Sequence, residues 1–297
     1  MRNGSLPRTQ TPRLDLVAFE TSPFPYRGNI PEQGTPFLNV NDGGRLGHAS
    51  PRGGTYWEDQ TYSDRRALLY IPRGFDPRRP AVMIVYFHGN NSTLERDVRD
   101  RQGVPRQVAE SGLNAVLVAP QFAVDARDSS AGRFWEPGVF GEFLHEAAGH
   151  LAELSGNNAL QGVFDQMPVI IVAYSGGYMP ASAALDVGNV GGRVEGVILL
   201  DALYGETGKF ADWIARRDSA FFFSAYSKST RDQNLELQRM LSERGVSFDA
   251  GLSERLGQGS VTFLDVGDVE HNDFVSQAWA QDPLQRLLSR IGGYSRA

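Results

Sequence analysis

The chain has 297 residues, of which 41% are hydrophobic and 22% are charged, as in an ordinary globular protein. The net charge of −6, without any block of like charges, argues against nucleic acid as a partner. The absence of cysteine excludes disulfides, a thiolate nucleophile and metal sites with cysteine ligands. No apolar stretch approaches the roughly 18 residues that a membrane-spanning helix needs.

The first residues carry charge but lack the apolar stretch and the cleavage site of a secretory signal. We therefore expect a cytoplasmic protein if the sequence is complete, and a periplasmic or secreted one if a signal was trimmed. Nothing in the sequence indicates the oligomeric state.

Residues 1–62 are rich in Gly, Pro, Asn and Thr and have no sustained period. They predict a loop-rich N-terminal extension with one or two short strands. We expect this extension to pack on the main body through apolar anchors, namely Phe24, Tyr26, Phe37, Tyr56 and Trp57.

From residue 63 onward, strand-sized apolar runs alternate with helical segments. We predict strands over 66–72, 81–87, 114–119, 168–174, 194–200, 219–226 and 260–266. Helices are expected over 93–111, 140–155, 178–186, 208–216, 233–245 and 273–291. Because most of these strands are continuous apolar runs, they predict a mostly parallel sheet that is covered on both faces. Residues 63–297 therefore read as one three-layer α/β/α domain, with an inserted segment near 121–140 above the carboxyl edge of the sheet.

The stretch AYSGG, residues 173–177, stands where an expected strand passes into an expected helix. Such a tight turn needs small neighbours and exposes its central residue at the carboxyl edge of the sheet. Ala173 and Gly177 occupy the two small positions, and Pro180 fits the first turn of the helix, where a missing N–H costs little. Ser175 is therefore the candidate nucleophile.

A serine hydroxyl becomes a good nucleophile only when a base removes its proton. Of the five histidines, only His271 lies downstream of Ser175, a few residues after the last expected strand. His145 and His150 resemble a zinc-binding HExxH pair, but their spacing rotates them roughly 140° apart on a helix. We therefore assign His271 as the base and expect no metal and no cofactor.

The base needs a carboxylate that orients its imidazole. Asp201 directly follows the apolar run GVILL, where an unpaired charge would be costly. Asp232 also follows a strand, but it falls in a capping-box-like start of the helix 233–245. We favour Asp201 and keep Asp232 as the alternative, with Glu206 as a weaker third.

A tetrahedral intermediate also needs N–H donors for its oxyanion. Gly176, directly after the nucleophile, supplies one, and the loop HGNN after strand 81–87 supplies another through Gly89 and Asn90. Tyr174, which precedes the nucleophile, joins them as an expected substrate-binding residue.

Three motifs follow one another along the chain: YFHGNN after an early strand, AYSGG at the strand–helix junction, and EHNDF after the last strand. The candidate serine, acid and histidine occur in that order. In these features, residues 65–290 resemble the α/β-hydrolase superfamily. The resemblance implies a mostly parallel sheet of about eight strands and serine-dependent hydrolysis through an acyl-enzyme. The chain departs from the superfamily at Ala173, at HGNN and in the acid, which follows the sixth strand rather than the seventh.

We therefore expect a serine hydrolase that cleaves an ester or related acyl bond of a small molecule through an acyl-enzyme on Ser175, with an amidase or peptidase as the alternative of the same chemistry. A non-catalytic binding protein that retains the fold is the alternative of another class. Arg127, Arg133 and Trp135 are expected at the mouth of the site, where an arginine could hold a substrate carboxylate or form a surface salt bridge.

Overall fold

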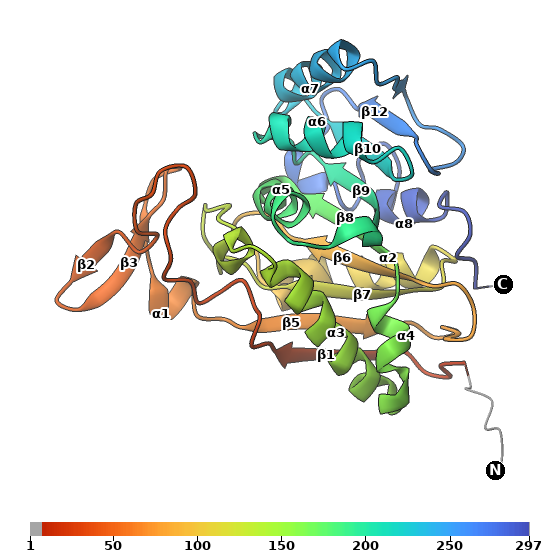
Figure 1. Ribbon diagram of the computed structural model, residues 1–297, viewed down its shortest axis with the longest axis horizontal. Helices are drawn as coiled ribbons and strands as arrows, with labels where there is room; N and C mark the ends of the chain where they lie inside the picture. The colour runs from red at the N-terminus through yellow and green to blue at the C-terminus, as the bar shows by residue number, and fades with distance from the viewer. Residues whose placement is uncertain (1–7, 297) are drawn as a thin grey trace.

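A nine-stranded sheet forms the centre of the computed structural model, which describes residues 8–296 (Figure 1). From one edge to the other, the strands are β1 (Arg13–Ala18), β5 (Arg66–Ile71), β7 (Ala115–Pro120), β6 (Val82–Phe87), β8 (Val169–Tyr174), β9 (Val194–Leu200), β10 (Phe221–Tyr226), β12 (Val261–Asp265) and β11 (Asp249–Ala250). Only β5 runs against its neighbours, and all other pairings among β6 to β12 are parallel. The expected three-layer α/β fold is confirmed, and this strand order is that of the α/β-hydrolase fold.

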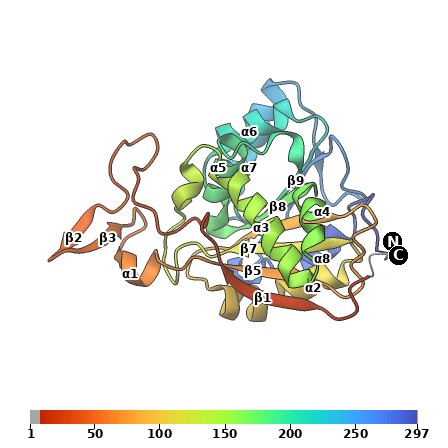
Figure 2. The same ribbon diagram turned by 60° about the horizontal axis from the view of Figure 1, so that its bottom comes forward.

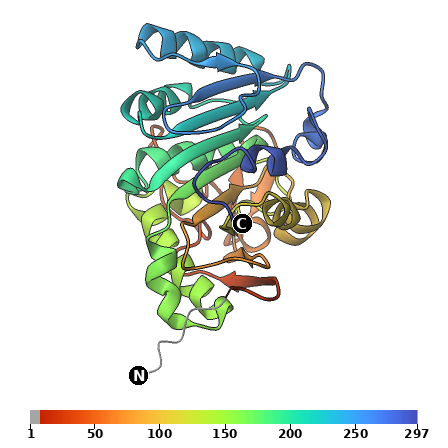
Figure 3. The same ribbon diagram turned by 90° about the vertical axis from the view of Figure 1, so that its right-hand side faces the viewer.

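Helices cover both faces of the sheet, as Figure 3 shows from the side. One face packs against α3 (Val139–Ser155), α4 (Gln161–Asp165), α5 (Tyr178–Asp186), α6 (Thr207–Arg216) and α7 (Arg231–Glu243). The other face packs against a π-helix (Leu94–Arg101), α2 (Val104–Glu110) and α8 (Pro283–Leu288). Because both faces are buried, the central strands β6, β7 and β8 consist of buried residues only. None of the described helices has the length and apolarity needed to span a membrane.

The N-terminal segment contains four strands, whereas we expected one or two. β1 pairs with β5 at the edge of the main sheet. β2 (Val40–Asp42), β3 (Arg45–Ala49) and β4 (Thr55–Trp57) form a separate antiparallel sheet that projects from the body (Figure 2), followed by the short helix α1 (Glu58–Thr61). Gly43 and Gly44 both have positive φ between β2 and β3, as a two-residue hairpin turn requires. That Gly-Gly signal and the alternating pattern of RLDLVA were readable in the sequence.

The segment 93–111 is not one helix, contrary to our prediction. It breaks at Gly103, which has a φ of 58° and separates the π-helix from α2. Pro105 lies in the first turn of α2 and cannot donate the N–H that would continue the preceding helix.

The C-terminal segment 273–291 is also less helical than predicted, since only Pro283–Leu288 forms an α-helix. Asp282 precedes this helix with a φ of 52°, a conformation outside any right-handed helix, and Arg106 of α2 pairs with its carboxylate. The inserted segment 121–140 contains the short 3₁₀ helix Gly132–Trp135, and Phe122, Ala126 and Phe134 anchor it in the core.

The strand register brings three loops to one edge of the sheet. Phe87 at the end of β6 pairs with Ala173 of β8, which in turn pairs with Leu199 of β9. The residues that follow these strands therefore emerge side by side at the carboxyl edge, where ligands bind in open α/β sheets.

Candidate active site

Ser175 lies at a sharp turn between β8 and α5. Its φ of 53° is in the left-handed region, which is strained for a residue with a side chain. A 3₁₀ turn over Ser175–Gly177 leads directly into α5. A Cβ atom on Gly177 would lie 2.4 Å from the carbonyl oxygen of Phe87, so only glycine allows strand and helix to approach this closely. The turn therefore presents the Ser175 side chain at the carboxyl edge of the sheet.

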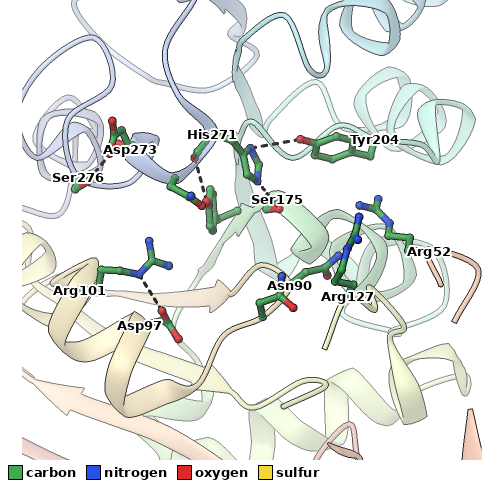
Figure 4. Close-up of a pocket in the computed structure, with 13 residues that line it drawn as sticks. Arg52, Asn90, Asp97, Arg101, Arg127, Ser175, Tyr204, His271, Asp273 and Ser276 are labelled. Atoms are coloured by element: carbon green, nitrogen blue, oxygen red, sulfur yellow. Dashed lines mark hydrogen bonds and ion pairs between the residues drawn. The ribbon is translucent and has the colours of Figure 1, made fainter. Parts of the chain in front are cut away.

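His271 follows β12 and begins a 3₁₀ turn over His271–Asp273. Its Nε2 atom lies 2.7 Å from Ser175 Oγ, and its Nδ1 atom lies 2.6 Å from Asp201 Oδ2. Figure 4 shows Ser175 beside His271, two residues that lie 96 positions apart in the sequence. The structure thus brings these two and Asp201 together, the three side chains that the sequence suggested.

Asp201 is completely buried at the end of β9, where its φ of 44° also lies in the left-handed region. Its carboxylate accepts hydrogen bonds from the backbone N–H of Ser227 and from three hydroxyl groups, those of Ser227, Ser229 and Thr230. A buried charge is tolerated only with such partners. The loop after β10 therefore provides most of the shell that holds this carboxylate.

Two opposing effects act on the pKa of Asp201. Burial by itself raises the pKa, but the hydrogen bonds from His271, Ser227, Ser229 and Thr230 outweigh it and lower the pKa to about 2. The carboxylate is therefore ionised at neutral pH and acts only as a hydrogen-bond acceptor. It follows that Nδ1 of His271 carries the proton and Nε2 accepts the hydroxyl proton of Ser175.

The alternative acids do not reach the imidazole in the described part of the chain. Asp232 lies in the first turn of α7 and has no hydrogen bond to His271. The capping box expected there is not formed: the Thr230 hydroxyl accepts no hydrogen bond from the first turn of α7, and it donates to Asp201. Glu206 pairs with Lys209, with 2.7 Å between its Oε2 and the Nζ atom.

Two tyrosines surround the imidazole of His271. The Tyr174 ring stacks on it, with 5.1 Å between ring centroids and 22° between the planes, and the Tyr174 hydroxyl donates to the His271 carbonyl oxygen. The Tyr204 hydroxyl lies 3.3 Å from Nδ1 and 3.0 Å from Ser229 Oγ. Tyr174 is therefore a wall of the site and a support of the histidine, a second role that the sequence did not suggest.

The loop after β6 passes directly beside Ser175. A Cβ atom on Gly89 would lie 2.7 Å from the Cβ of Ser175, so this position also requires glycine. The Asn90 side chain reaches the edge of Gly176 and accepts a hydrogen bond from Ser129 Oγ at 3.1 Å. Among residues 8–296, the backbone N–H of Asn90 has no hydrogen-bond acceptor, which leaves it available to a ligand.

His88 holds this loop in place through hydrogen bonds of both ring nitrogens. It is buried, its Nδ1 donates to the Gly89 carbonyl oxygen, and its Nε2 accepts from the Phe122 N–H and the Gln121 side chain. Desolvation by burial lowers its pKa to about 4, so the ring is neutral at pH 7. His88 is thus a structural residue that joins the loop after β6 to the segment 121–140.

The other histidines lie away from Ser175. His145 and His150 lie on α3, where they contact the carboxylates of Asp165 and Glu153 respectively. His48 is buried in the N-terminal segment and stacks on Phe37. Residues 8–296 contain no group of three or more His, Asp or Glu side chains arranged to hold a metal ion.

A pocket of about 690 Å³ opens above Ser175. Arg127 lines it as expected, but Arg133 and Trp135 do not. Arg133 donates to the Glu20 carbonyl oxygen and pairs with Glu136, and Trp135 packs against Tyr26 and Phe37. The residues that line the pocket are Arg52, Asn90, Asn91, Asp97, Arg101, Arg127, Tyr174, Ser175, Tyr204, His271, Asn272, Asp273 and Ser276. Arg52 and Arg101 were missed, because no sequence pattern relates them to Ser175.

No model of a known protein family matches the chain, and no curated protein matches its sequence. Among solved structures, a feruloyl esterase module of Clostridium thermocellum in complex with sinapinate is similar at 15% identity and a TM-score of 0.49, over 90% of this chain and 97% of that one. An S-formylglutathione hydrolase of Agrobacterium tumefaciens is similar at 13% identity and a TM-score of 0.48, over 85% and 98% of the two chains. A thermostable esterase of Pseudomonas putida gives 13% identity and a TM-score of 0.45, over 76% of each chain. These identities are too low to transfer an activity to this chain.

Proposed function

We propose that this protein is a serine hydrolase that cleaves an ester of a small molecule through an acyl-enzyme on Ser175. The observation that carries the proposal is the continuous hydrogen-bonded chain from Ser175 Oγ through His271 to the buried carboxylate of Asp201, with heavy-atom distances of 2.7 and 2.6 Å. In this series of hydrogen bonds, the hydroxyl of Ser175 has a base beside it, and the imidazole of His271 has a carboxylate that orients it.

In the first half of the reaction, Ser175 Oγ attacks the ester carbonyl carbon while His271 Nε2 takes the hydroxyl proton. The carbonyl electron pair moves onto oxygen, and the carboxylate of Asp201 stabilises the imidazolium that forms. When the tetrahedral intermediate collapses, the bond to the leaving group breaks. His271 then gives its proton to the departing alkoxide.

The second half repeats these steps with water in place of the serine. His271 takes a proton from water, the resulting hydroxide attacks the acyl carbon, and collapse returns the proton to Ser175 Oγ. The acid product and the free enzyme are released. No cofactor is required in this scheme.

The negative charge of each tetrahedral intermediate needs hydrogen-bond donors. We assign this role to the backbone N–H groups of Asn90 and Gly176. The position of Gly89 directly against Ser175 and the unpaired Asn90 N–H support the assignment. One such donor contributes on the order of 3 kcal/mol to lowering the barrier.

A fluorophosphonate probe tests the nucleophile, because it reacts covalently with activated serines. We expect the wild-type protein to be labelled and Ser175→Ala to remain unlabelled. Ser242→Ala is the matched control, since this exposed serine of α7 bonds only the Gln238 carbonyl oxygen and is expected to label normally. Absence of labelling in the folded wild-type protein would favour a binding protein that retains the fold.

The alternative within the same chemistry is an amidase or peptidase. Rates on a matched ester and amide of one acyl group separate the two. Because esters are intrinsically more reactive than amides, a higher ester rate alone does not separate the two classes. Cleavage of the ester without measurable cleavage of the amide supports the proposed esterase, whereas comparable kcat/KM values would make the amidase the better assignment.

A further inference from the structure

Two arginines from different loops line the pocket above Ser175. Arg52 belongs to the loop between β3 and β4, and Arg127 belongs to the segment after β7. The Arg52 guanidinium lies over the Tyr204 ring, 5.3 Å from its centroid. Figure 4 shows both arginine side chains on the same side of Ser175. Their charges therefore face the space in which a substrate would lie.

Two side chains of the N-terminal segment, those of Ser50 and Tyr56, bind the backbone of Arg127. Ser50 Oγ donates to the Arg127 carbonyl oxygen at 2.8 Å, and the Arg127 N–H donates to the Tyr56 hydroxyl at 3.1 Å. These contacts hold Arg127 beside the loop that carries Arg52, although 75 positions separate the two in the sequence. The pair is thus a feature of the folded N-terminal segment and the body together.

Neither guanidinium has a carboxylate partner in the described part of the chain. By contrast, Arg101, which lines the same pocket, donates to the Asp97 carboxylate at 2.8 Å. The acidic residues of the pocket, Asp97 and Asp273, lie on the opposite side of Ser175 from Arg52 and Arg127 in the view of Figure 4. On their side of this concave site, the two positive charges have no carboxylate partner among residues 8–296, and such a pair attracts an anion.

We propose that Arg52 and Arg127 form a subsite for an anionic group of the substrate, so that the preferred substrate is an ester that carries a second, ionised group. A guanidinium matches a carboxylate or a phosphate with paired N–H donors, and the pair could clamp such a group while the ester carbonyl lies at Ser175. The inference rests on the proposed ester hydrolysis at Ser175 and names the substrate class for it.

The test compares two nitrophenyl esters that differ in one charge: the hemiester of adipic acid and the same ester with its free carboxylate capped by methyl. The measured quantity is the ratio of kcat/KM for the charged ester to that for the capped ester. We expect the wild-type protein to favour the charged ester. Arg52→Gln and Arg127→Gln should each lower the ratio on the order of 10-fold, and the double variant should lower it further.

Arg99→Gln is the matched control. This half-buried arginine of the π-helix pairs with Asp100 and does not line the pocket, so its removal should leave the ratio unchanged. Labelling of Ser175 by the fluorophosphonate probe verifies that each variant is folded with an intact nucleophile. A wild-type ratio near one, or an unchanged ratio in the double variant, overturns the subsite.

Competition assays identify the anion. Adipate and inorganic phosphate are tested as inhibitors of hydrolysis of the capped ester. Stronger inhibition by adipate assigns a carboxylate, stronger inhibition by phosphate assigns a phosphate, and inhibition by neither contradicts the subsite. If Ser175 is labelled and the capped ester is cleaved, but the ratio does not depend on the arginines, only the subsite fails. If Ser175 is not labelled, the proposed hydrolysis fails with it.

Discussion

The imidazole of His271 stacks face to face on the phenol ring of Tyr174, and the hydroxyl of that tyrosine donates to the backbone carbonyl oxygen of the same histidine. One side chain thus holds both the ring and the main chain of His271. Tyr174 directly precedes Ser175 in the sequence. The residue that supports His271 is therefore the chain neighbour of the proposed nucleophile.

Removal of the Tyr174 hydroxyl tests this support. Tyr174→Phe keeps the stacked ring and loses one hydrogen bond, so we expect kcat to fall about 2- to 10-fold, since such a bond contributes ~0.5–1.5 kcal/mol. Tyr174→Ala loses the stack as well and should lower kcat further. The check is steady-state kinetics together with the pH profile of kcat/KM. Equal rates for Tyr174→Phe and Tyr174→Ala would show that the ring does not orient His271.

The substitution Asp201→Asn tests which acid orients His271, Asp201 or its alternative Asp232. The change keeps the size of the side chain but removes the acceptor that keeps the Nδ1 proton in place, so under the proposed mechanism we expect kcat to fall about 10,000-fold, as the same change does in a Ser-His-Asp protease. Asp232→Asn on α7 should leave kcat near the wild-type value. Ester hydrolysis by the purified variants is the measurement, and a reversed order of the two effects would transfer the role to Asp232.

Asp201 should also make stability depend on pH. Its folded-state pKa of about 2 lies below the ordinary value of 3.8, so the ionised form stabilises the fold above pH ~4. This contribution, on the order of 2 kcal/mol, should be lost as the pH falls from about 4 through 2. The free energy of unfolding, measured against pH, should therefore decline less steeply in Asp201→Asn than in the wild type. Parallel curves would be inconsistent with a depressed pKa at this site.

The glycines of the nucleophile turn provide a steric test. Gly177→Ala places a methyl group 2.4 Å from the Phe87 carbonyl oxygen, and we expect it to lower the free energy of unfolding by about 1–3 kcal/mol. In Gly208→Ala, on α6, nothing lies within 4 Å of the new Cβ, so stability should stay the same or rise by up to about 1 kcal/mol. Denaturant unfolding measures both, and equal effects would mean that the turn is not tightly packed.

Local patterns were sufficient to predict most of the fold from the sequence. The strands of the main sheet after residue 63 are continuous apolar runs, and their positions agree with β5, β6, β7, β8, β9, β10 and β12 within one or two residues. The errors fell where a single residue changes the backbone direction, at Gly103 and Asp282. They also fell in the N-terminal segment, where short strands find their partners only through tertiary contacts.

The sequence by itself determined which residues could act as nucleophile and base. A serine between a strand and a helix is a local feature, and His271 is the only histidine downstream of it. Which carboxylate contacts His271 was decided only by the tertiary structure, since several carboxylates lie between Ser175 and His271. The contact depends on which carboxylate lies buried where β9 and β10 end, surrounded by hydroxyl donors.

The arginine pair is likewise a product of the tertiary structure alone. Arg52 and Arg127 carry no motif, and in the sequence Arg127 and Arg133 were equivalent candidates. In the folded protein, Arg133 pairs with the carboxylate of Glu136, whereas Arg127 lines the pocket together with Arg52. The physical reason is that strand and helix signals act over a few neighbouring residues, whereas a charge acquires or lacks a partner only when distant loops meet.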